Sequence, residues 1–166
     1  MKILIIGPSG AGKTHLSKEF KKMGLNVFDT DELEGLHGWY DSQKKKVPFP
    51  RDAGKEFMDN HEFLWDRKFL KNFLAQNPDI YLFGNSGNAS KMIDLFDKIY
   101  FLKVPKNVLI QRLDHQSRKN PMGKTDFQKQ VVLEWADKNE EEAKALGIRF
   151  IDGTLSPKEI LKLITA

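Results

Sequence analysis

The chain has 166 residues, of which 40% are hydrophobic and 30% are charged, a composition typical of a folded globular domain and not of a disordered chain. It contains no cysteine, which excludes disulfides, thiolate zinc sites and thiol catalysis. The net charge of +4 comes from Lys and Arg residues spread along the chain, which suits a bound polyphosphate and disfavours nucleic acid as a partner. No apolar run approaches the roughly 20 residues of a membrane-spanning helix. We expect a cytoplasmic protein, monomeric or dimeric.

The predicted elements alternate between strands and helices. A short apolar run at residues 2–6 predicts a strand that is buried on both faces of a parallel sheet. This alternation predicts an α/β domain of three layers, in which helices cover both faces of a five-stranded parallel sheet. We expect one domain over residues 1–166. The other expected strands are 25–28, 79–83, 98–103 and 148–151, and the expected helices are 13–23, 55–76, 88–96, 105–116, 126–146 and the segment from Pro157 onward.

The segment between the second and third strands differs in composition from its surroundings. Residues 36–54 contain prolines, glycines and aromatic residues, and we expect no regular core element there. In the helix expected next, Trp65, Phe69 and Phe73 recur at four-residue spacing, which places them on its buried face. Long irregular segments in compact domains are usually functional. We therefore predict a substrate-binding region at about residues 36–76.

The first strand runs directly into a glycine-rich loop of the pattern G-x-x-x-x-G-K-[ST]. Its glycines allow the backbone to turn tightly and to approach phosphates. Successive backbone N–H groups and the N-terminus of the following helix form an anion site. Lys13 is expected to reach the β- and γ-phosphates, and the Thr14 hydroxyl to bind Mg²⁺. We predict ATP and Mg²⁺ as cofactors, bound by Gly7, Pro8, Ser9, Gly10, Ala11, Gly12, Lys13, Thr14 and the adjoining His15.

Two carboxylates, Asp29 and Asp31, follow the second strand. In an open α/β sheet, ligands bind outside the carboxyl ends of the strands. We expect one carboxylate, Asp29, to hold Mg²⁺ with Thr14, and Asp31 to orient the acceptor or to take its proton. The pattern does not settle which carboxylate has which role. Alternatively, Thr30 or Asp31 caps the next helix, and both functions can coexist in one turn.

Three arginines are candidates for binding anionic or planar groups. Residues 117–125 are polar, contain proline and glycine, and are expected to form a lid. Arg118 in this lid would neutralise charge that develops on the transferred phosphoryl group. Arg112 would lie against the adenine ring, because a planar guanidinium stacks well on aromatic rings. Arg51 is a candidate for holding an anionic group of the substrate.

A second glycine-containing turn follows the third strand. Gly84 lets the backbone approach a substrate, and Asn85 and Ser86 offer hydrogen-bonding groups to it. The alternative is an ordinary strand-to-helix turn in which Asn88 caps the helix.

These motifs together resemble those of the small P-loop kinases, the superfamily of adenylate, shikimate and gluconate kinases, and their layout is most similar to that of shikimate kinases. The resemblance implies the sheet order 2-3-1-4-5 and direct transfer of the ATP γ-phosphoryl group to a small-molecule acceptor, such as a metabolite hydroxyl. It also implies that Thr154 and Pro157 border the adenine. The second glycine turn lacks three consecutive glycines, and residues 36–51 match no subfamily, so the acceptor stays open. The resemblance rests on the phosphate loop, Asp29-x-Asp31, Gly84–Gly87, Arg112, Arg118 and residues 151–154.

Two other functions stay open at this point. A nucleoside or nucleoside-monophosphate kinase would stack a base in the region of Trp39, Tyr40 and Phe49. A non-catalytic regulator would bind ATP without an acceptor. The sequence lacks the Asn-Lys-x-Asp segment that reads guanine, which disfavours a GTPase.

Overall fold

The computed structural model describes residues 1–115 and 122–166. Its central sheet has five parallel strands in the order β2-β6-β1-β7-β8, which is the predicted order 2-3-1-4-5. The predicted strand boundaries are correct to within two residues. The strands are β1 (Lys2–Ile6), β2 (Val27–Asp29), β6 (Ile80–Phe83), β7 (Lys98–Lys103) and β8 (Arg149–Asp152).

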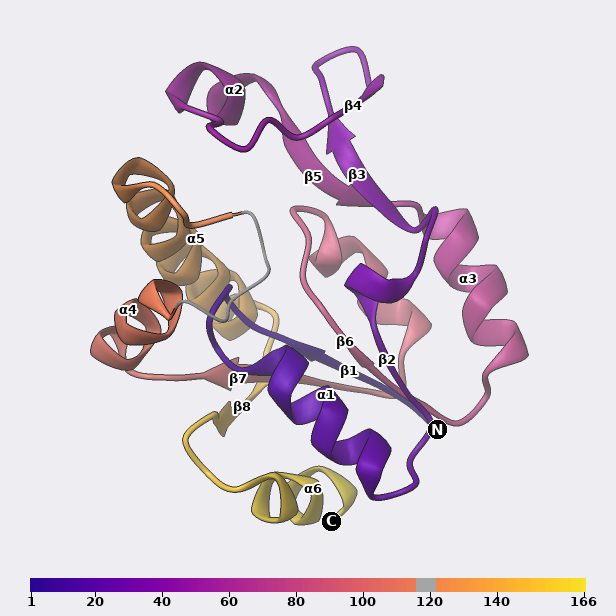
Figure 1. Cartoon of the computed structure of the whole chain (residues 1–166). Coiled ribbons are helices and arrows are strands. Elements are labelled where there is room, and N and C mark those ends of the chain that lie inside the picture. Colours follow the sequence, from indigo (N-terminus) through magenta and orange to yellow (C-terminus); the bar gives the residue numbers. More distant parts are fainter. Residues whose placement is uncertain (116–121) are drawn as a thin grey trace.

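Helices cover both faces of this sheet, as the alternation predicted (Figure 1). Ile3 and Ile5 of β1 point into a core shared with α1, α4 and α6, whereas Leu4 points into a second core with α3 and η2. Successive strand residues face opposite sides, so the continuous apolar run of β1 supplies both cores. None of the described helices is long and apolar enough to cross a membrane. The helices are α1 (Lys13–Lys22), α3 (Arg67–Gln76), α4 (Lys106–Asp114), α5 (Asp126–Ala145), α6 (Pro157–Thr165) and the 3-10 helices η1 (Thr30–Glu32) and η2 (Ala89–Leu95).

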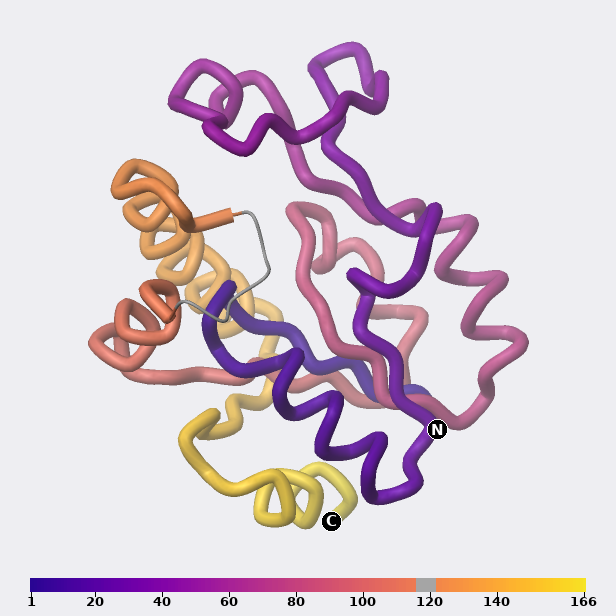
Figure 2. Tube along the Cα trace, viewed as in Figure 1, coloured from indigo at the N-terminus to yellow at the C-terminus, as the bar shows by residue number. Residues whose placement is uncertain are grey.

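A small antiparallel sheet projects from the main body beyond the carboxyl ends of the parallel strands (Figure 2). Its strands β3 (His37–Tyr40), β4 (Lys46–Val47) and β5 (Glu62–Trp65) have the order β4-β3-β5. Helix α2 (Lys55–Asn60) lies between β4 and β5 in the chain. We call residues 37–65 the small subdomain.

Two sequence predictions for this segment are wrong. Residues 36–54 contain regular structure, because β3 lies there, and residues 55–76 are not one helix. Residues 62–65 pair with β3 instead, and Asp66 then begins a new helix by accepting a 2.8 Å hydrogen bond from the backbone N–H of Phe69. Trp65 is buried as a strand residue, so its spacing from Phe69 is not a helical repeat. Local composition could not reveal β3, because its partner strand is distant in sequence.

Candidate active site

The phosphate loop connects β1 to α1 in a conformation that requires glycine. Gly10 and Gly12 have φ values of +86° and +101°, which side-chain-bearing residues rarely adopt. A Cβ on Gly12 would also lie 3.1 Å from Nη1 of Arg112. Such a loop at a helix N-terminus turns backbone N–H groups into a concave anion site.

The side chain of Lys13 lies over this loop. Its Nζ donates hydrogen bonds to the carbonyl oxygens of Gly7 at 2.6 Å and Pro8 at 2.9 Å. An anion bound in the loop would compete with these two carbonyls for the ammonium group. Lys13 therefore lies where a phosphate-binding cation is needed.

Asp29 lies between the phosphate loop and the turn that carries Asp31. Its Oδ2 accepts a 2.9 Å hydrogen bond from Oγ1 of Thr14, and its Oδ1 accepts a 3.1 Å bond from the backbone N–H of Asp31. Asp29 is only 4% exposed and caps η1, the role that the sequence offered to Thr30 or Asp31. The Thr14 hydroxyl and the Asp29 carboxylate are hard oxygen donors, the kind that Mg²⁺ binds alongside phosphate oxygens and water.

Asp31 has an unusual electrostatic environment. Its side chain reaches solvent, yet the protein around it removes enough water to raise its pKa, and the Asp29 carboxylate raises that pKa further. Lys13 and His37 partly oppose this shift. Asp31 therefore binds a proton more readily than an ordinary aspartate, as suits a group that receives one.

Arg112 contacts the outside of the phosphate loop. Its Nη1 donates to the carbonyl oxygens of Ala11 at 2.8 Å and Gly10 at 3.4 Å. The guanidinium is therefore tied to the loop, and its contact with adenine stays a prediction. His15 is exposed in the first turn of α1.

The turn between β8 and α6 lies beside the start of the segment that leads to α4. Gly153 N–H donates a 2.7 Å bond to the carbonyl of Lys103. Within the turn, Asp152 Oδ1 accepts from Thr154 N and Oγ1, at 2.8 and 2.6 Å, and Pro157 is the first residue of α6. The adenine-bordering role of Thr154 and Pro157 stays a prediction.

The second glycine turn joins the parallel sheet to the small subdomain. The Asn88 side chain bonds both backbone groups of Trp65, with Oδ1 accepting from N at 2.9 Å and Nδ2 donating to O at 3.0 Å. Ser86 Oγ donates to Asn88 Oδ1, and Gly87 N–H donates to the carbonyl of Phe63. Asn88 does not cap η2 with its side chain. A substrate role for Gly84, Asn85 and Ser86 stays a prediction.

Two predicted cations remain, Arg51 and Arg118. Arg51 is an exposed residue of the small subdomain, and its carbonyl accepts a 3.1 Å bond from Gln128 Nε2. Arg118, with most of the predicted lid at residues 117–125, lies outside the described residues.

Most of the chain matches one known protein family. A family model described as an AAA domain matches residues 3–145. The chain belongs to the AAA-domain family. No curated protein is significantly similar to it in sequence.

Solved kinase structures share the fold of this AAA-domain protein. Shikimate kinase from Acinetobacter baumannii in complex with shikimate has a TM-score of 0.61 at 17% identity, covering 98% of this chain and 92% of that chain. A gluconokinase from Sinorhizobium meliloti scores 0.53 at 16% identity, covering 97% and 87%. Deoxyadenosine kinase from M. mycoides scores 0.51 at 17% identity, covering 99% and 97%. At these identities the likeness concerns the fold, and it confirms the predicted small P-loop kinase fold without specifying a subfamily.

The AAA-domain protein also has polar groups near Asp31 that sequence reasoning did not select. His37 opposes the rise in the pKa of Asp31, and it is paired with Trp65 across β3 and β5. Among the described residues, buried side-chain atoms without a hydrogen-bond partner are Thr30 Oγ1, His37 Nε2 and Trp65 Nε1. No local sequence pattern singles out His37, because its place beside the site depends on the pairing of β3 with β5.

Proposed function

We propose that the protein is an ATP- and Mg²⁺-dependent kinase that transfers the γ-phosphoryl group to a hydroxyl of a small molecule. The observation that carries this proposal is the chain of hydrogen bonds from Thr14 through Asp29 to the backbone of Asp31. It joins a phosphate-binding loop to a second carboxylate whose pKa is raised. A regulator that only binds ATP needs the loop but has no use for such a carboxylate.

The phosphates of the nucleotide would be held by the groups that form the anion site of the phosphate loop. The loop N–H groups and Lys13 would hold the phosphates, with Lys13 exchanging the Gly7 and Pro8 carbonyls for phosphate oxygens. Thr14 and Asp29 would hold Mg²⁺, which suits a metal that takes one or two protein oxygens and keeps several waters. When bound, Mg²⁺ neutralises charge that develops on the phosphate oxygens.

Asp31 would act on the acceptor. Its carboxylate orients the acceptor hydroxyl for in-line attack on the γ-phosphorus and receives the hydroxyl proton. The new bond joins the acceptor oxygen to phosphorus, while the bond between phosphorus and the departing ADP oxygen breaks. The raised pKa of Asp31 favours receipt of this proton.

Two of the three aromatic residues expected to stack on a nucleoside base, Trp39 and Phe49, contact each other. Trp39 stacks on Phe49 with ring centroids 5.1 Å apart and an interplanar angle of 20°, and Phe57 packs against both rings. This packing favours a structural role in the small subdomain. The proposal therefore leaves the acceptor class to experiment.

A coupled ADP-release screen tests the proposal across nucleosides, nucleoside monophosphates, sugars, sugar acids and shikimate. One class of acceptor is expected to raise ADP release well above the rate with ATP and Mg²⁺ alone. Lys13→Ala should abolish this increase. Full activity in the Lys13→Ala variant would refute the assignment.

A further inference from the structure

Gln128, near the start of α5, is fully buried and uses the whole hydrogen-bonding capacity of its side-chain amide. Its Oε1 accepts 3.1 Å bonds from the N–H groups of Gly123 and Lys124. Its Nε2 donates to the carbonyl oxygens of Arg51 at 3.1 Å and Ala53 at 3.2 Å. An amide offers two acceptor and two donor positions, and burial is tolerated when all are used.

These bonds join two parts of the molecule, because α5 is fixed to the main body. Ala143, near the end of α5, is buried in the core that contains Leu4 of β1. Ion pairs of 2.7 Å link Asp137 to Lys106 and Glu140 to Lys103. The other end of α5 extends to the small subdomain beside α2 (Figure 1). The two Nε2 bonds thus tie that subdomain to a helix anchored on the parallel sheet.

The remaining contact between α5 and the small subdomain is incompletely packed. Trp39 and Trp135 lie with ring centroids 6.3 Å apart, and Phe49 and Met58 pack against a small core that includes Val131. A pocket of about 340 Å³ lies between α2 and α5. Dispersion forces are weaker across such a gap than in a filled interior, so the directional Gln128 bonds become more important.

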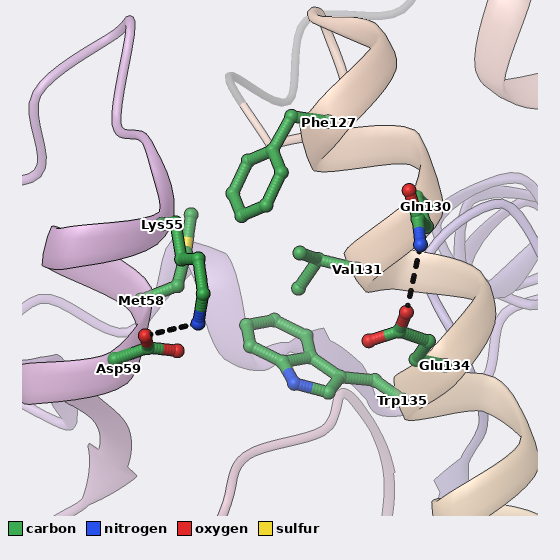
Figure 3. Close-up of a pocket in the computed structure, with 8 residues that line it drawn as sticks. All are labelled: Lys55, Met58, Asp59, Phe127, Gln130, Val131, Glu134 and Trp135. Atoms are coloured by element: carbon green, nitrogen blue, oxygen red, sulfur yellow. Dashed lines mark hydrogen bonds and ion pairs between the residues drawn. The ribbon is translucent and has the colours of Figure 1, made fainter.

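The polar side chains that line the pocket do not bridge it. In Figure 3, Lys55 pairs with Asp59 on α2, and Gln130 bonds to Glu134 on α5. Each of these interactions stays within one helix and would survive if the two helices separated. The bonds from Gln128 to Arg51 and Ala53 would not survive.

We propose that Gln128 is a positioning residue that holds the small subdomain against α5, over the candidate active site. Gly123 and Lys124 fix Oε1, so that the amide NH₂ group is directed at the Arg51 and Ala53 carbonyls. Gln128 thereby fixes the position of the backbone from which the Arg51 side chain extends. A contact between Arg51 and the acceptor rests on the proposed function, whereas the hold on the subdomain does not.

Distances between spin labels in the unliganded protein test this proposal. Because the chain has no cysteine, Ser42→Cys and Lys18→Cys provide one labelled pair, between the small subdomain and α1. Both positions are exposed. Gln128→Met removes all of the amide bonds with a side chain of similar length. Gln128→Glu keeps the acceptor for Gly123 and Lys124 but directs a carboxylate at two carbonyls. Gln130→Met is the matched control, because Gln130 is exposed and bonds to Glu134 on its own helix.

The parent and Gln130→Met are expected to give one distance population. Gln128→Met and Gln128→Glu should add a longer population at temperatures where circular dichroism shows both variants folded. In Gln128→Glu this population should shrink as acid protonates the new carboxyl. A side chain that contributed only stability would lower the unfolding midpoint without a longer distance. A parent-like single distance in Gln128→Glu, which decides the matter if Gln128→Met does not fold, would overturn the proposal. The distances are measured without nucleotide or acceptor, so they do not depend on phosphoryl transfer. Failure of the proposed kinase function can therefore be distinguished from failure of the proposed role of Gln128.

Discussion

The hydroxyl of Thr14 donates a 2.9 Å hydrogen bond to the Asp29 carboxylate, although β6 lies between the strands that lead to these two residues. The contact requires the turn after β2 to cross the end of β6. Gly84 makes this crossing possible, because a Cβ there would lie 1.9 Å from Oγ1 of Thr30. The glycine after β6 therefore has a packing role that brings the carboxylates to the phosphate loop.

Gly84→Ala is accordingly expected to displace Thr30 and, with it, Asp29 and Asp31. Overpacking of this kind costs about 1–3 kcal/mol, so the free energy of unfolding should fall by that order, together with ADP release. Urea unfolding measures the first and the coupled assay the second. The control is Gly54→Ala, since no atom lies within 4 Å of a Cβ at Gly54. Equal stability of the two variants would contradict this role for Gly84.

The Thr14–Asp29 pair should control the dependence on Mg²⁺. Thr14→Val removes the hydroxyl and keeps the shape of the side chain, whereas Thr14→Ser keeps the hydroxyl. Loss of an interaction made to developing charge typically costs about 10²-fold or more in rate. Thr14→Val is therefore expected to lose activity on that order and to need more Mg²⁺, while Thr14→Ser stays near the parent. Titration of ADP release with Mg²⁺ measures both effects, and equal Mg²⁺ curves for the two variants would argue against the pair as a metal site.

Asp31 should make the protein less stable as the pH rises. Its pKa is raised by desolvation and then by Asp29, so the folded state binds the proton more tightly than the unfolded state does. Between the ordinary aspartate pKa and the raised value, unfolding releases a proton, and the free energy of unfolding therefore falls with increasing pH. Asp31→Asn should be more stable than the parent at neutral pH, and this difference should vanish below the ordinary aspartate pKa.

Thermal unfolding over a pH series checks this sign, and Asp94→Asn provides a control of opposite sign. The hydrogen bond from Arg67 lowers the pKa of Asp94, so its contribution to stability is present above the ordinary aspartate pKa and is lost as the pH falls. If Asp31→Asn followed the same trend as Asp94→Asn, the environment described for Asp31 would be wrong.

Asn88 should stabilise the attachment of β5 to the parallel sheet. Asn88→Ala leaves the N–H and carbonyl of Trp65 without these side-chain partners, and an unsatisfied buried group costs roughly 1–3 kcal/mol. The free energy of unfolding in urea should fall by that order, whereas Asn72→Ala, at an exposed position of α3, should change it little. Unfolding midpoints that coincide for both variants would refute the bridging role.

The parallel sheet and the phosphate loop could be predicted because their signals are local. The apolar run of β1 and the loop pattern after it are contiguous in the sequence. The small subdomain could not be predicted in the same way, because residues 37–40 find their partners at residues 62–65. The bridge to Trp65 from Asn88, which the sequence offered as a helix cap, and the bonds of Gln128 could not be predicted for the same reason. Asn88 and Gln128 are ordinary polar residues until the fold brings a distant backbone to each of them.

The fate of a labelled γ-phosphoryl group decides whether the protein is a kinase. ATP labelled at the γ-phosphate is incubated with Mg²⁺, the protein and each acceptor class of the screen, and the products are separated. Label is expected on one class of acceptor and should be lost in both Lys13→Ala and Asp31→Asn. Label found only as inorganic phosphate with every class, or transfer that Asp31→Asn leaves unchanged, would contradict the proposed kinase function.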